Sequence, residues 1–405
     1  MTQGVAPFST IVVVGAGLAG LKAVEGLRNK GFDGSLTLVG SESRLPYDRP
    51  PLSKGFLAGK DEMARLALTS EDKLASLGVE FANGETAVSL DLVARIVRLG
   101  SGRSLPFDGL VIATGATPRR LLSLGDLEGV MTLRRLEDSV SLRHRLSASG
   151  VRLVVVGGGF LGMEVAATAR GLGADVMVVE PLATPLARVL GPVIGRTIEA
   201  LHRDNGVELR MGLGVDSVEG SDRVERVRLS DGTTVEAEVV LVAIGVTPET
   251  TWLERSGLAL DDGVICSSSL TAAPGVVAAG DLARFPHPLA SSAVRLEHRT
   301  NAAEQGAHAA ASLLAGDQAE PFTLVPYFWS DQYDVKIQSI GIPSPTDEVE
   351  VVAGSLDERR FVACCGRNGQ LSAVVGFGMP REVMRFHPLL TSGAAFSSAV
   401  RFLDA

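Results

Sequence analysis

The sequence predicts an α/β fold with two Rossmann-like nucleotide-binding domains and a C-terminal α+β domain. Two stretches, TIVVVGAGLAGLKAVEGL from Thr10 and RLVVVGGGFLGMEVAATARGLGADVMVVE from Arg152, each lead from an apolar strand through a G-x-G-x-x-G turn into a helix. Such glycines let the backbone approach a pyrophosphate, and the helix N-terminus offers free N–H groups and the positive end of its dipole. From Phe322 onward the pattern changes to short alternating strands, which indicates a smaller separate domain.

The length of the chain fits this division. A chain of 405 residues has room for two or three domains, each with its own core. We expect a discontinuous first domain (residues 1–116 and 245–320), a second domain (residues 117–244) and a C-terminal domain (residues 321–405).

Composition argues against several classes of protein. No apolar stretch reaches the roughly 20 residues that span a bilayer, and the N-terminus lacks the pattern of a signal peptide. We therefore expect no membrane association and a cytoplasmic location. A net charge of −9 argues against nucleic-acid binding. The three cysteines, Cys266, Cys364 and Cys365, have no spacing suited to a disulfide framework, a metal site or a C-x-x-C pair, so we expect small buried residues and no metal.

The first nucleotide-binding unit begins at a buried strand over residues 10–14. A helix is expected to reach about Asn29, and residues 36–39 form the second strand. Glu42 is the first carboxylate after that strand, where an acidic side chain can accept hydrogen bonds from a ribose. The turn between strand and helix contains Gly15, Ala16, Gly17, Ala19 and Gly20.

A proline-rich loop follows over residues 45–54. Its prolines are expected to fix an extended path and to forbid a helix before Ser53. Arg49 and Lys54 therefore lie on a stiff segment that is suited to placing a cation, although a solvated proline loop would give the same pattern.

The remainder of the first half supplies further strands. Residues 80–88 and 95–99 are predicted as strands of a small antiparallel layer. Residues 110–115 are predicted as a buried strand that ends in small residues, and a linker and a helix lead into the second unit.

In the second unit, Gly157, Gly159 and Gly162 follow an apolar strand, and Glu180 closes the next strand. The Glu180 carboxylate would accept hydrogen bonds from a ribose 2′-hydroxyl and repel a 2′-phosphate. No arginine follows until Arg188, so the pattern favours NADH over NADPH. A helix around residues 194–201 and strands near residues 208–211, 224–229, 235–237 and 239–245 complete this domain.

Residues 276–281 are predicted as a short strand that ends in Gly280 and Asp281. The Asp281 carboxylate could contact a sugar-like chain, cap a helix, or do both. An alanine-rich helix over residues 301–314 precedes a break at residues 316–321. The C-terminal domain then has strands at residues 336–340, 348–352, 361–365 and 372–377 and a final helix. Its aromatic run, residues 326–333, fits either an interface or an ordinary core.

Together the motifs resemble a known family, the FAD-dependent NADH:ferredoxin reductases of the glutathione-reductase structural type. The resemblance covers essentially the whole chain in the right order. PYDRPPLSK and PYFWSDQYD are more specific than the glycine turns. The other matching pieces are VVVGAGLAG, ATGATPR, TLRRLED, VVVGGGFLGMEVAA, AIGVTP, AAGDLARF and EHRTNAAEQG.

The resemblance implies FAD in the first site and NADH in the second. It makes Lys54 the lysine near flavin N5 and Glu164 the acid near the nicotinamide, and an ion pair between the two is expected. It makes Trp329 the aromatic residue beside the flavin, on the side where an acceptor protein docks. Its FAD residues are Gly15, Ala16, Gly17, Ala19, Gly20, Ser41, Glu42, Arg49, Lys54, Ala87, Ala113, Thr114, Gly115, Arg134, Gly280, Asp281, Glu297, Arg299 and Trp329, and its NAD residues are Gly157, Gly159, Phe160, Leu161, Gly162, Glu164, Glu180, Arg188 and Gly245.

Three positions depart from the family pattern. Ser41 and Glu42 follow Gly40 where relatives often have aspartate, so Glu42 or Ser41 takes the ribose contact. Arg299 stands where relatives often carry tryptophan, and Glu249 stands where asparagine is common.

The resemblance implies hydride transfer from NADH to FAD and single-electron transfer to a [2Fe-2S] ferredoxin of a cytochrome P450 or Rieske oxygenase. Reduction of rubredoxin, monodehydroascorbate or a quinone on the same fold is the nearest alternative, and a redox-sensing flavoprotein is another. We expect a monomer or a weak homodimer. Because the chain is acidic, docking an acidic ferredoxin would need a local basic patch, with Arg295, Arg299, Lys336, Arg381 and Arg385 as candidates.

Overall fold

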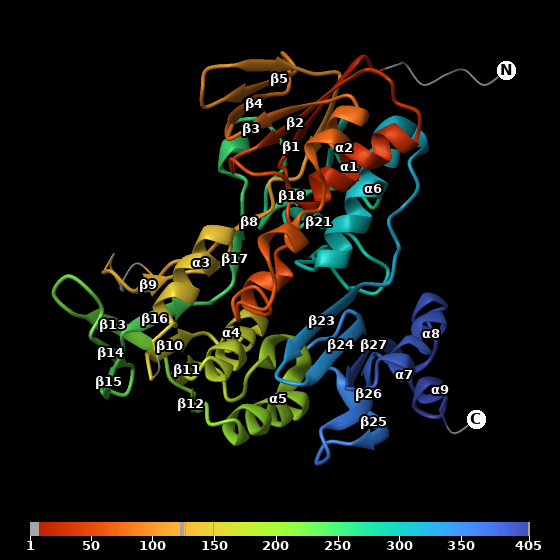
Figure 1. Cartoon of the computed structure of the whole chain (residues 1–405). Coiled ribbons are helices and arrows are strands. Elements are labelled where there is room, and N and C mark those ends of the chain that lie inside the picture. Colours follow the sequence, from red (N-terminus) through yellow and green to blue (C-terminus); the bar gives the residue numbers. More distant parts are fainter. Residues whose placement is uncertain (1–7, 122–124, 126, 149, 404–405) are drawn as a thin grey trace. The chain divides into compact units, whose positions relative to one another are not determined.

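The structure, a computed structural model, describes residues 8–121, 125, 127–148 and 150–403 (Figure 1). The chain divides into two compact units. Unit 1 contains Met1–Asp48, Ala64–Thr117 and Thr247–Leu324, and unit 2 contains Arg49–Met63, Pro118–Val246 and Val325–Ala405. The chain passes from one unit to the other on both sides of residues 49–63, near β8 (Ala116–Pro118), near β17 (Val246–Pro248) and after Leu324.

Unit 1 is built on a six-stranded sheet of order β19-β20-β7-β1-β2-β3. All neighbouring pairs are parallel except β19 and β20. Because β1 lies between β2 and β7, the direction of winding reverses at its carboxyl end, where ligands of such sheets bind. The strands are β1 (Thr10–Val14), β2 (Ser35–Gly40), β3 (Val79–Asn83), β7 (Gly109–Ile112), β19 (Thr271–Ala273) and β20 (Val276–Ala278).

Two helices pack together on this sheet, α1 (Leu18–Asn29) and α6 (Arg299–Ala315). Helix α1 buries Ala23, Val24 and Leu27, and the chain turns away at Gly31, whose φ is 87°. The close approach depends on small residues: a Cβ on Gly26 would meet the Ala310 Cβ at 3.0 Å.

Smaller elements complete unit 1. They are α2 (Glu71–Ser76), the antiparallel layer β4 (Ala87–Asp91), β5 (Ile96–Leu99) and β6 (Ser104–Pro106), the layer β18 (Val264–Ile265), β21 (Ala283–Phe285) and β22 (Val294–Arg295), and the 3₁₀ turns η2 (Met63–Leu66), η4 (Thr251–Leu253) and η5 (Gly316–Gln318).

One strand prediction in this unit is wrong. Residues 80–88 are not one strand of the antiparallel layer, because the chain turns at Gly84, whose φ is 71°. Before the turn, β3 pairs in parallel with β2, and after it β4 joins β5.

Unit 2 contains a parallel sheet of order β12-β11-β10-β16-β9. Its strands are β9 (Val130–Met131), β10 (Arg152–Val156), β11 (Asp175–Glu180), β12 (Glu208–Met211) and β16 (Val239–Val242), and its helices are α3 (Leu136–Arg145), α4 (Phe160–Gly171) and α5 (Ala187–Asp204). Helix α5 is interrupted at Gly191, whose φ is 72°, just before Pro192.

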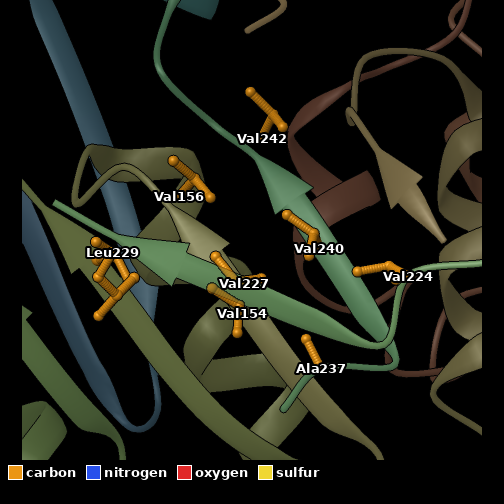
Figure 2. Close-up of a cluster of buried hydrophobic side chains, with 9 residues drawn as sticks. Val154, Val156, Val224, Val227, Leu229, Ala237, Val240 and Val242 are labelled. Atoms are coloured by element: carbon orange, nitrogen blue, oxygen red, sulfur yellow. The ribbon is translucent and has the colours of Figure 1, made fainter. Parts of the chain in front are cut away.

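A three-stranded layer, β13 (Val215–Glu219), β14 (Arg226–Leu229) and β15 (Thr234–Glu236), packs on this sheet. Figure 2 shows Val154 and Val156 of β10 and Val240 and Val242 of β16 in one cluster with side chains of β14. The sequence pattern did not predict β13, whose residues are only partly buried.

The C-terminal part of unit 2 is an antiparallel sheet of order β23-β24-β27-β26-β25. Its strands are β23 (Tyr327–Gln332), β24 (Val335–Gly341), β25 (Glu348–Ser355), β26 (Arg360–Arg367) and β27 (Gln370–Phe377), with the short helices α7 (Pro380–Met384), α8 (His387–Thr391) and α9 (Phe396–Val400). Cys364 and Cys365 lie buried in β26, as predicted.

The expectation for the proline loop is also wrong in part. Pro50–Ser53 form a 3₁₀ helix, η1, before Lys54. Proline suits the first turn of a helix, because its φ is already helical and its missing N–H would have no partner there.

Candidate active site

The first glycine turn lies at the carboxyl edge of the unit 1 sheet. Gly15 has a φ of 115°, and a Cβ there would lie 2.1 Å from the Ala113 oxygen at the end of β7. A Cβ on Gly20 would lie 1.8 Å from the Gly15 oxygen, so this glycine allows α1 to pack on the turn. Gly17 differs, since apart from its two chain neighbours no heavy atom of the described residues comes within 4 Å of the Cβ position.

Three segments meet at this edge. Ala113 donates its N–H to the Val14 oxygen at 2.7 Å. Gly280 follows β20 and its Cβ position lies 3.0 Å from the Ala19 Cβ, while its N–H donates to the buried Gln305 Oε1 at 2.8 Å. The structure therefore brings together the predicted glycine turn, the segment that continues into Thr114 and Gly115, and Gly280.

Asp281 lies in a turn that leads directly into β21 and not into a helix, so the prediction that it caps a helix is wrong. Its carboxylate lies near His298 at the start of α6. Burial lowers the pKa of His298 to about 4, and the Asp281 charge opposes that shift.

Glu42 is half-buried after β2, and its Oε2 accepts a 2.5 Å hydrogen bond from the Tyr47 hydroxyl. Ser41 is exposed, and Ala87 begins β4. Of the two ribose candidates, Glu42 is therefore the one that the fold holds in a fixed position.

Arg299, the first residue of α6, donates its Nε to both carboxylate oxygens of Asp48, at 2.7 and 2.9 Å. Glu297 accepts from the Arg295 Nη1 at 2.5 Å, and only 9% of the Arg295 side chain is exposed. Two of the candidate docking cations are thus already bound to carboxylates.

The second glycine turn repeats the geometry of the first. Gly157 has a φ of 111° with its Cβ position 2.5 Å from the Ala243 oxygen, and a Cβ on Gly162 would lie 2.1 Å from the Gly157 oxygen. Apart from the two chain neighbours of Gly159, no heavy atom of the described residues lies within 4 Å of its Cβ position. Phe160 and Leu161 begin α4, which has no side-chain cap, so its first N–H groups face the turn.

Glu180 lies over this turn. It is 9% exposed, and its Oε2 accepts the Gly158 N–H at 2.7 Å while its Oε1 accepts the Leu182 N–H at 3.0 Å. Arg188 is exposed near the start of α5, and Gly245 follows β16 with a φ of 96°.

Lys54 and Glu164 form an ion pair, as predicted from the sequence. The Lys54 Nζ lies 2.6 Å from the Glu164 Oε2, and the two side chains are 18% and 8% exposed. Ser53 Oγ donates to the same oxygen at 2.6 Å, and Ser330 Oγ donates to Oε1 at 2.6 Å. Arg49, in the same loop, donates to the Arg134 carbonyl at 2.7 Å.

Strand β23 carries the aromatic run with alternate burial. Phe328, Ser330 and Gln332 are buried, whereas Tyr327, Trp329 and Asp331 are partly exposed. The Tyr327 and Trp329 rings stack 5.9 Å apart, the Phe328 ring contacts that of Phe160 edge to face at 5.0 Å, and Lys336 Nζ pairs with Asp331 at 2.9 Å.

Sequence reasoning did not single out several residues at these sites. They are Tyr47, Asp48, Ser53, Gln305, Ser330 and Gln332. Ser53 and Ser330 lie within motifs that were recognised, and the alternation in β23 could have assigned Ser330 and Gln332 to the inward face.

Both turns fit a dinucleotide. In each, the first and third glycines are needed for close packing of the chain on itself, and the second faces open space at an uncapped helix N-terminus. This is the arrangement by which backbone N–H groups and a helix dipole bind pyrophosphate.

Thiol chemistry has no comparable site. The three cysteines are buried and free, and burial raises the pKa of Cys266 and of Cys364 to about 12. Thiols that stay protonated are poor nucleophiles.

Among the helices that the structure describes, none is long and apolar enough to cross a membrane.

Comparison with known proteins agrees with this geometry. Residues 9–306 match the family model for pyridine nucleotide-disulphide oxidoreductases, and residues 327–404 match the reductase C-terminal domain. Rhodocoxin reductase from Rhodococcus erythropolis is 36% identical over 95% of this chain and 90% of its own. Putidaredoxin reductase from Pseudomonas putida is 35% identical over 94% of this chain and 91% of its own.

Solved structures show the same relationship. The covalent putidaredoxin reductase–putidaredoxin complex matches with a TM-score of 0.91 at 34% identity, covering 95% of this chain and 93% of that chain. A persulfide reductase from A. fulgidus matches with a TM-score of 0.86 at 22% identity, which shows only that the fold is shared. The resemblance predicted from the motifs is confirmed: this chain belongs to the pyridine nucleotide-disulphide oxidoreductase family, within the group of ferredoxin reductases that carry a reductase C-terminal domain.

Proposed function

We propose that this chain uses NADH to reduce FAD and passes electrons singly to a [2Fe-2S] ferredoxin that serves a cytochrome P450 or a Rieske oxygenase. The observation that carries the proposal is the presence of two dinucleotide turns in a chain whose thiols are all buried. With no accessible dithiol to receive them, the electrons must leave to an external acceptor. A further relative, 39% identical over 82% of this chain, is named the ferredoxin–NAD⁺ reductase component of the p-cumate 2,3-dioxygenase system of Pseudomonas putida, and this name points to a ferredoxin.

We assign the first turn to FAD and the second to NADH. When bound, FAD accepts hydride from the nicotinamide and releases the two electrons one at a time. The proposed FAD residues are those of the turn at Gly15–Gly20, Ser41, Glu42, Arg49, Lys54, Ala87, Ala113, Thr114, Gly115, Arg134, Gly280, Asp281, Glu297, Arg299 and Trp329, and the proposed NAD residues are Gly157, Gly159, Phe160, Leu161, Gly162, Glu164, Glu180, Arg188 and Gly245.

Lys54 and Glu164 are the proposed catalytic residues. A lysine ammonium that is 18% exposed can stabilise negative charge that develops next to it, since partial exclusion of water strengthens the interaction. Glu164 holds the ammonium by the 2.6 Å contact and so fixes where its charge lies.

Glu180 is the proposed basis for the choice of NADH. Its carboxylate is fixed over the turn by two backbone N–H groups and has acceptor capacity left for ribose hydroxyls. A 2′-phosphate at the same place would meet a buried negative charge, and the nearest arginine along the chain, Arg188, is exposed.

Trp329 and the outward face of β23 are the proposed exit side. Of the predicted docking cations, Arg295 and Arg299 are bound to carboxylates of unit 1 and Lys336 is paired with Asp331. Arg381 and Arg385 are exposed on and beside α7 and are the better candidates. The three-domain division, the monomeric or weakly dimeric state and the cytoplasmic location stay predictions.

A panel of acceptors tests this function. The purified flavoprotein is supplied with NADH and, in turn, with a [2Fe-2S] ferredoxin, a rubredoxin, monodehydroascorbate and a quinone, and kcat/KM is compared. The proposal expects the ferredoxin to be preferred by at least about 10-fold, a gap of about 1.4 kcal/mol in transition-state binding. Preference for rubredoxin, monodehydroascorbate or the quinone would support the corresponding alternative and contradict the proposal.

A further inference from the structure

A row of buried polar side chains in unit 2 begins at the Glu164 Oε1, whereas Lys54 contacts the Oε2 of the same carboxylate. Ser330 Oγ contacts the Glu164 Oε1 at 2.6 Å and receives the Gln332 Nε2 at 3.1 Å. Gln332 Oε1 lies 2.9 Å from the His202 Nε2, and the Tyr333 hydroxyl lies 3.3 Å from the His202 Nδ1. Ser330, Gln332 and His202 are each 0% exposed.

The direction of the first three hydrogen bonds in this row, counted from Glu164, follows from the carboxylate. A carboxylate only accepts, so the single hydroxyl proton of Ser330 goes to Glu164. The Ser330 oxygen is then an acceptor toward Gln332, which must present its NH₂ group. The remaining Gln332 oxygen accepts from His202, which must therefore carry its proton on Nε2.

The histidine fits this role. Burial lowers the pKa of His202 to about 4, against the smaller opposing effect of the Gln332 hydrogen bond, so the ring is neutral at pH 7. A neutral ring with its proton on Nε2 has an acceptor at Nδ1, which is where the Tyr333 hydroxyl lies. Four hydrogen bonds thus point one way, from Tyr333 to Glu164.

The backbone at the start of the row is strained. Tyr333 has a φ of 56°, a left-handed conformation that is uncommon for a bulky residue. Its ring contacts that of His202 edge to face at 5.1 Å. The two-residue turn that joins β23 to β24 requires this conformation, since Gln332 pairs directly with Val335.

We propose that Ser330 and Gln332 are positioning residues for Glu164, and that the directed row Tyr333–His202–Gln332–Ser330 fixes one carboxylate oxygen so that the other faces Lys54. The strand that carries the proposed exit residue, Trp329, thereby also orients the carboxylate at the proposed entry site. This inference rests on the proposed roles of Lys54 and Glu164.

A matched control for Ser330→Ala is available on the neighbouring strand. Ser339 of β24 is also 0% exposed, and within the described part of the chain its hydroxyl has no hydrogen-bond partner. Ser330→Ala and Ser339→Ala each remove one buried hydroxyl from the same sheet, but only the first removes a contact to Glu164. Ser330→Thr keeps the hydroxyl.

The first arm measures anaerobic reduction of the flavoprotein by NADH in a stopped-flow instrument. We expect Ser330→Ala to slow the limiting reduction rate by about 10-fold with a smaller change in the apparent NADH affinity. Ser330→Thr should recover most of the rate, and Ser339→Ala should match the wild type. Equal rates for the two alanine variants overturn the inference.

The Glu164→Gln variant separates the positioning role of Ser330 from the proposed catalytic role of Glu164. If it slows reduction and Ser330→Ala does not, the positioning role fails and the role of Glu164 stands. If neither variant slows reduction, the proposed role of Glu164 itself fails.

The second arm needs no turnover. Long-range ¹H–¹⁵N spectra of the holoprotein at pH 7 report the tautomer of His202, which a His202→Gln variant assigns among the six histidines. We expect the Nε2–H form and a shift of the His202 signals in both Tyr333→Phe and Ser330→Ala. The Nδ1–H form, or His202 signals that Ser330→Ala leaves unchanged, overturns the inference even if an activity variant fails to fold.

Discussion

The ion pair between Lys54 and Glu164 is the residue contact on which the proposed chemistry depends most. A 2.6 Å pair of mostly buried side chains leaves a buried charge without a partner when either member is removed. We predict that Lys54→Ala slows reduction of the flavin by NADH by about 100-fold, the lower range for loss of a positioned charged group. Stopped-flow absorbance at the flavin band measures this rate.

Lys60, an exposed lysine six positions further along the chain, provides the control. Lys60→Ala should reduce at the wild-type rate. Wild-type kinetics in Lys54→Ala would remove Lys54 from the mechanism.

A second prediction about a single residue concerns Glu180. Glu180→Ala should lower kcat/KM for NADH by about 10-fold, because a charge-assisted hydrogen bond is worth about 1.5–3 kcal/mol, and should leave NADPH turnover unchanged or improved. The ratio of the two kcat/KM values measures the effect. Asp175→Ala, a carboxylate loss at the opposite end of the same strand, should not alter the ratio. An unchanged ratio in Glu180→Ala would contradict the assignment.

The sequence predicted the pair but not its surroundings. Lys54 and Glu164 belong to motifs with known neighbours, whereas Ser330 reaches Glu164 across 166 positions of the chain. A serine in a strand has no local pattern that states which distant carboxylate it will meet, so that contact required the fold.

Among the elements, each glycine turn contains one glycine that is suited to ligand binding and others that are needed for packing. Gly159 has open space at its Cβ position, whereas a Cβ on Gly162 would lie 2.1 Å from a backbone oxygen. We predict that Gly159→Ala lowers the free energy of unfolding by less than about 1 kcal/mol yet weakens NAD⁺ binding by about 10-fold or more. Gly162→Ala should instead destabilise by about 1–3 kcal/mol, as overpacking does.

Chemical denaturation and calorimetric titration with NAD⁺ measure the two quantities. If Gly159→Ala binds the nucleotide as tightly as the wild type, the second turn is not a pyrophosphate cradle.

His202 of helix α5 gives a prediction about how the free energy of unfolding depends on pH. His202 has a folded pKa of about 4 against an ordinary value of 6.5, so the unfolded chain binds the extra proton first as pH falls. Its contribution to stability is therefore complete above about pH 6.5 and is lost between pH 6.5 and 4. Between pH 7 and pH 5, we expect the titration of His202 to lower the free energy of unfolding by about 2 kcal/mol.

His202→Gln should show a fall over this pH range that is smaller than the wild-type fall by that amount, as measured by denaturant unfolding at both pH values. Parallel pH dependence in the two proteins would show that His202 is not buried in its neutral form.

Most elements followed from periodicity. The apolar runs at β1, β7, β10 and β16 are buried strands, as their composition predicted. The errors arose where one or two residues change the path of the chain: the turn at Gly84 divides β3 from β4, and two prolines begin η1. Both outcomes depend on neighbouring strands and loops that a local pattern does not contain.

For the whole molecule, a discontinuous first domain was expected, but no pattern in the sequence indicated that residues 49–63 leave it. Residues 49–63 lie between segments of unit 1 in sequence but belong to unit 2. Their place there depends on distant contacts, such as the Ser139 hydroxyl donating to the Leu52 oxygen at 2.7 Å and the Thr168 hydroxyl donating to the Ser53 oxygen at 2.8 Å. The predicted boundaries treated this loop as part of the first domain.

The central claim is that electrons enter from NADH and leave singly to a ferredoxin. The most direct measurement is anaerobic double-mixing stopped flow, in which the flavoprotein is reduced by one equivalent of NADH and then mixed with excess oxidised [2Fe-2S] ferredoxin. We expect reduction by NADH to be faster than by NADPH, and about two equivalents of ferredoxin to be reduced per flavin, because a hydride carries two electrons and each cluster accepts one. A flavin that NADH reduces but that stays reduced after the second mixing would contradict the claim.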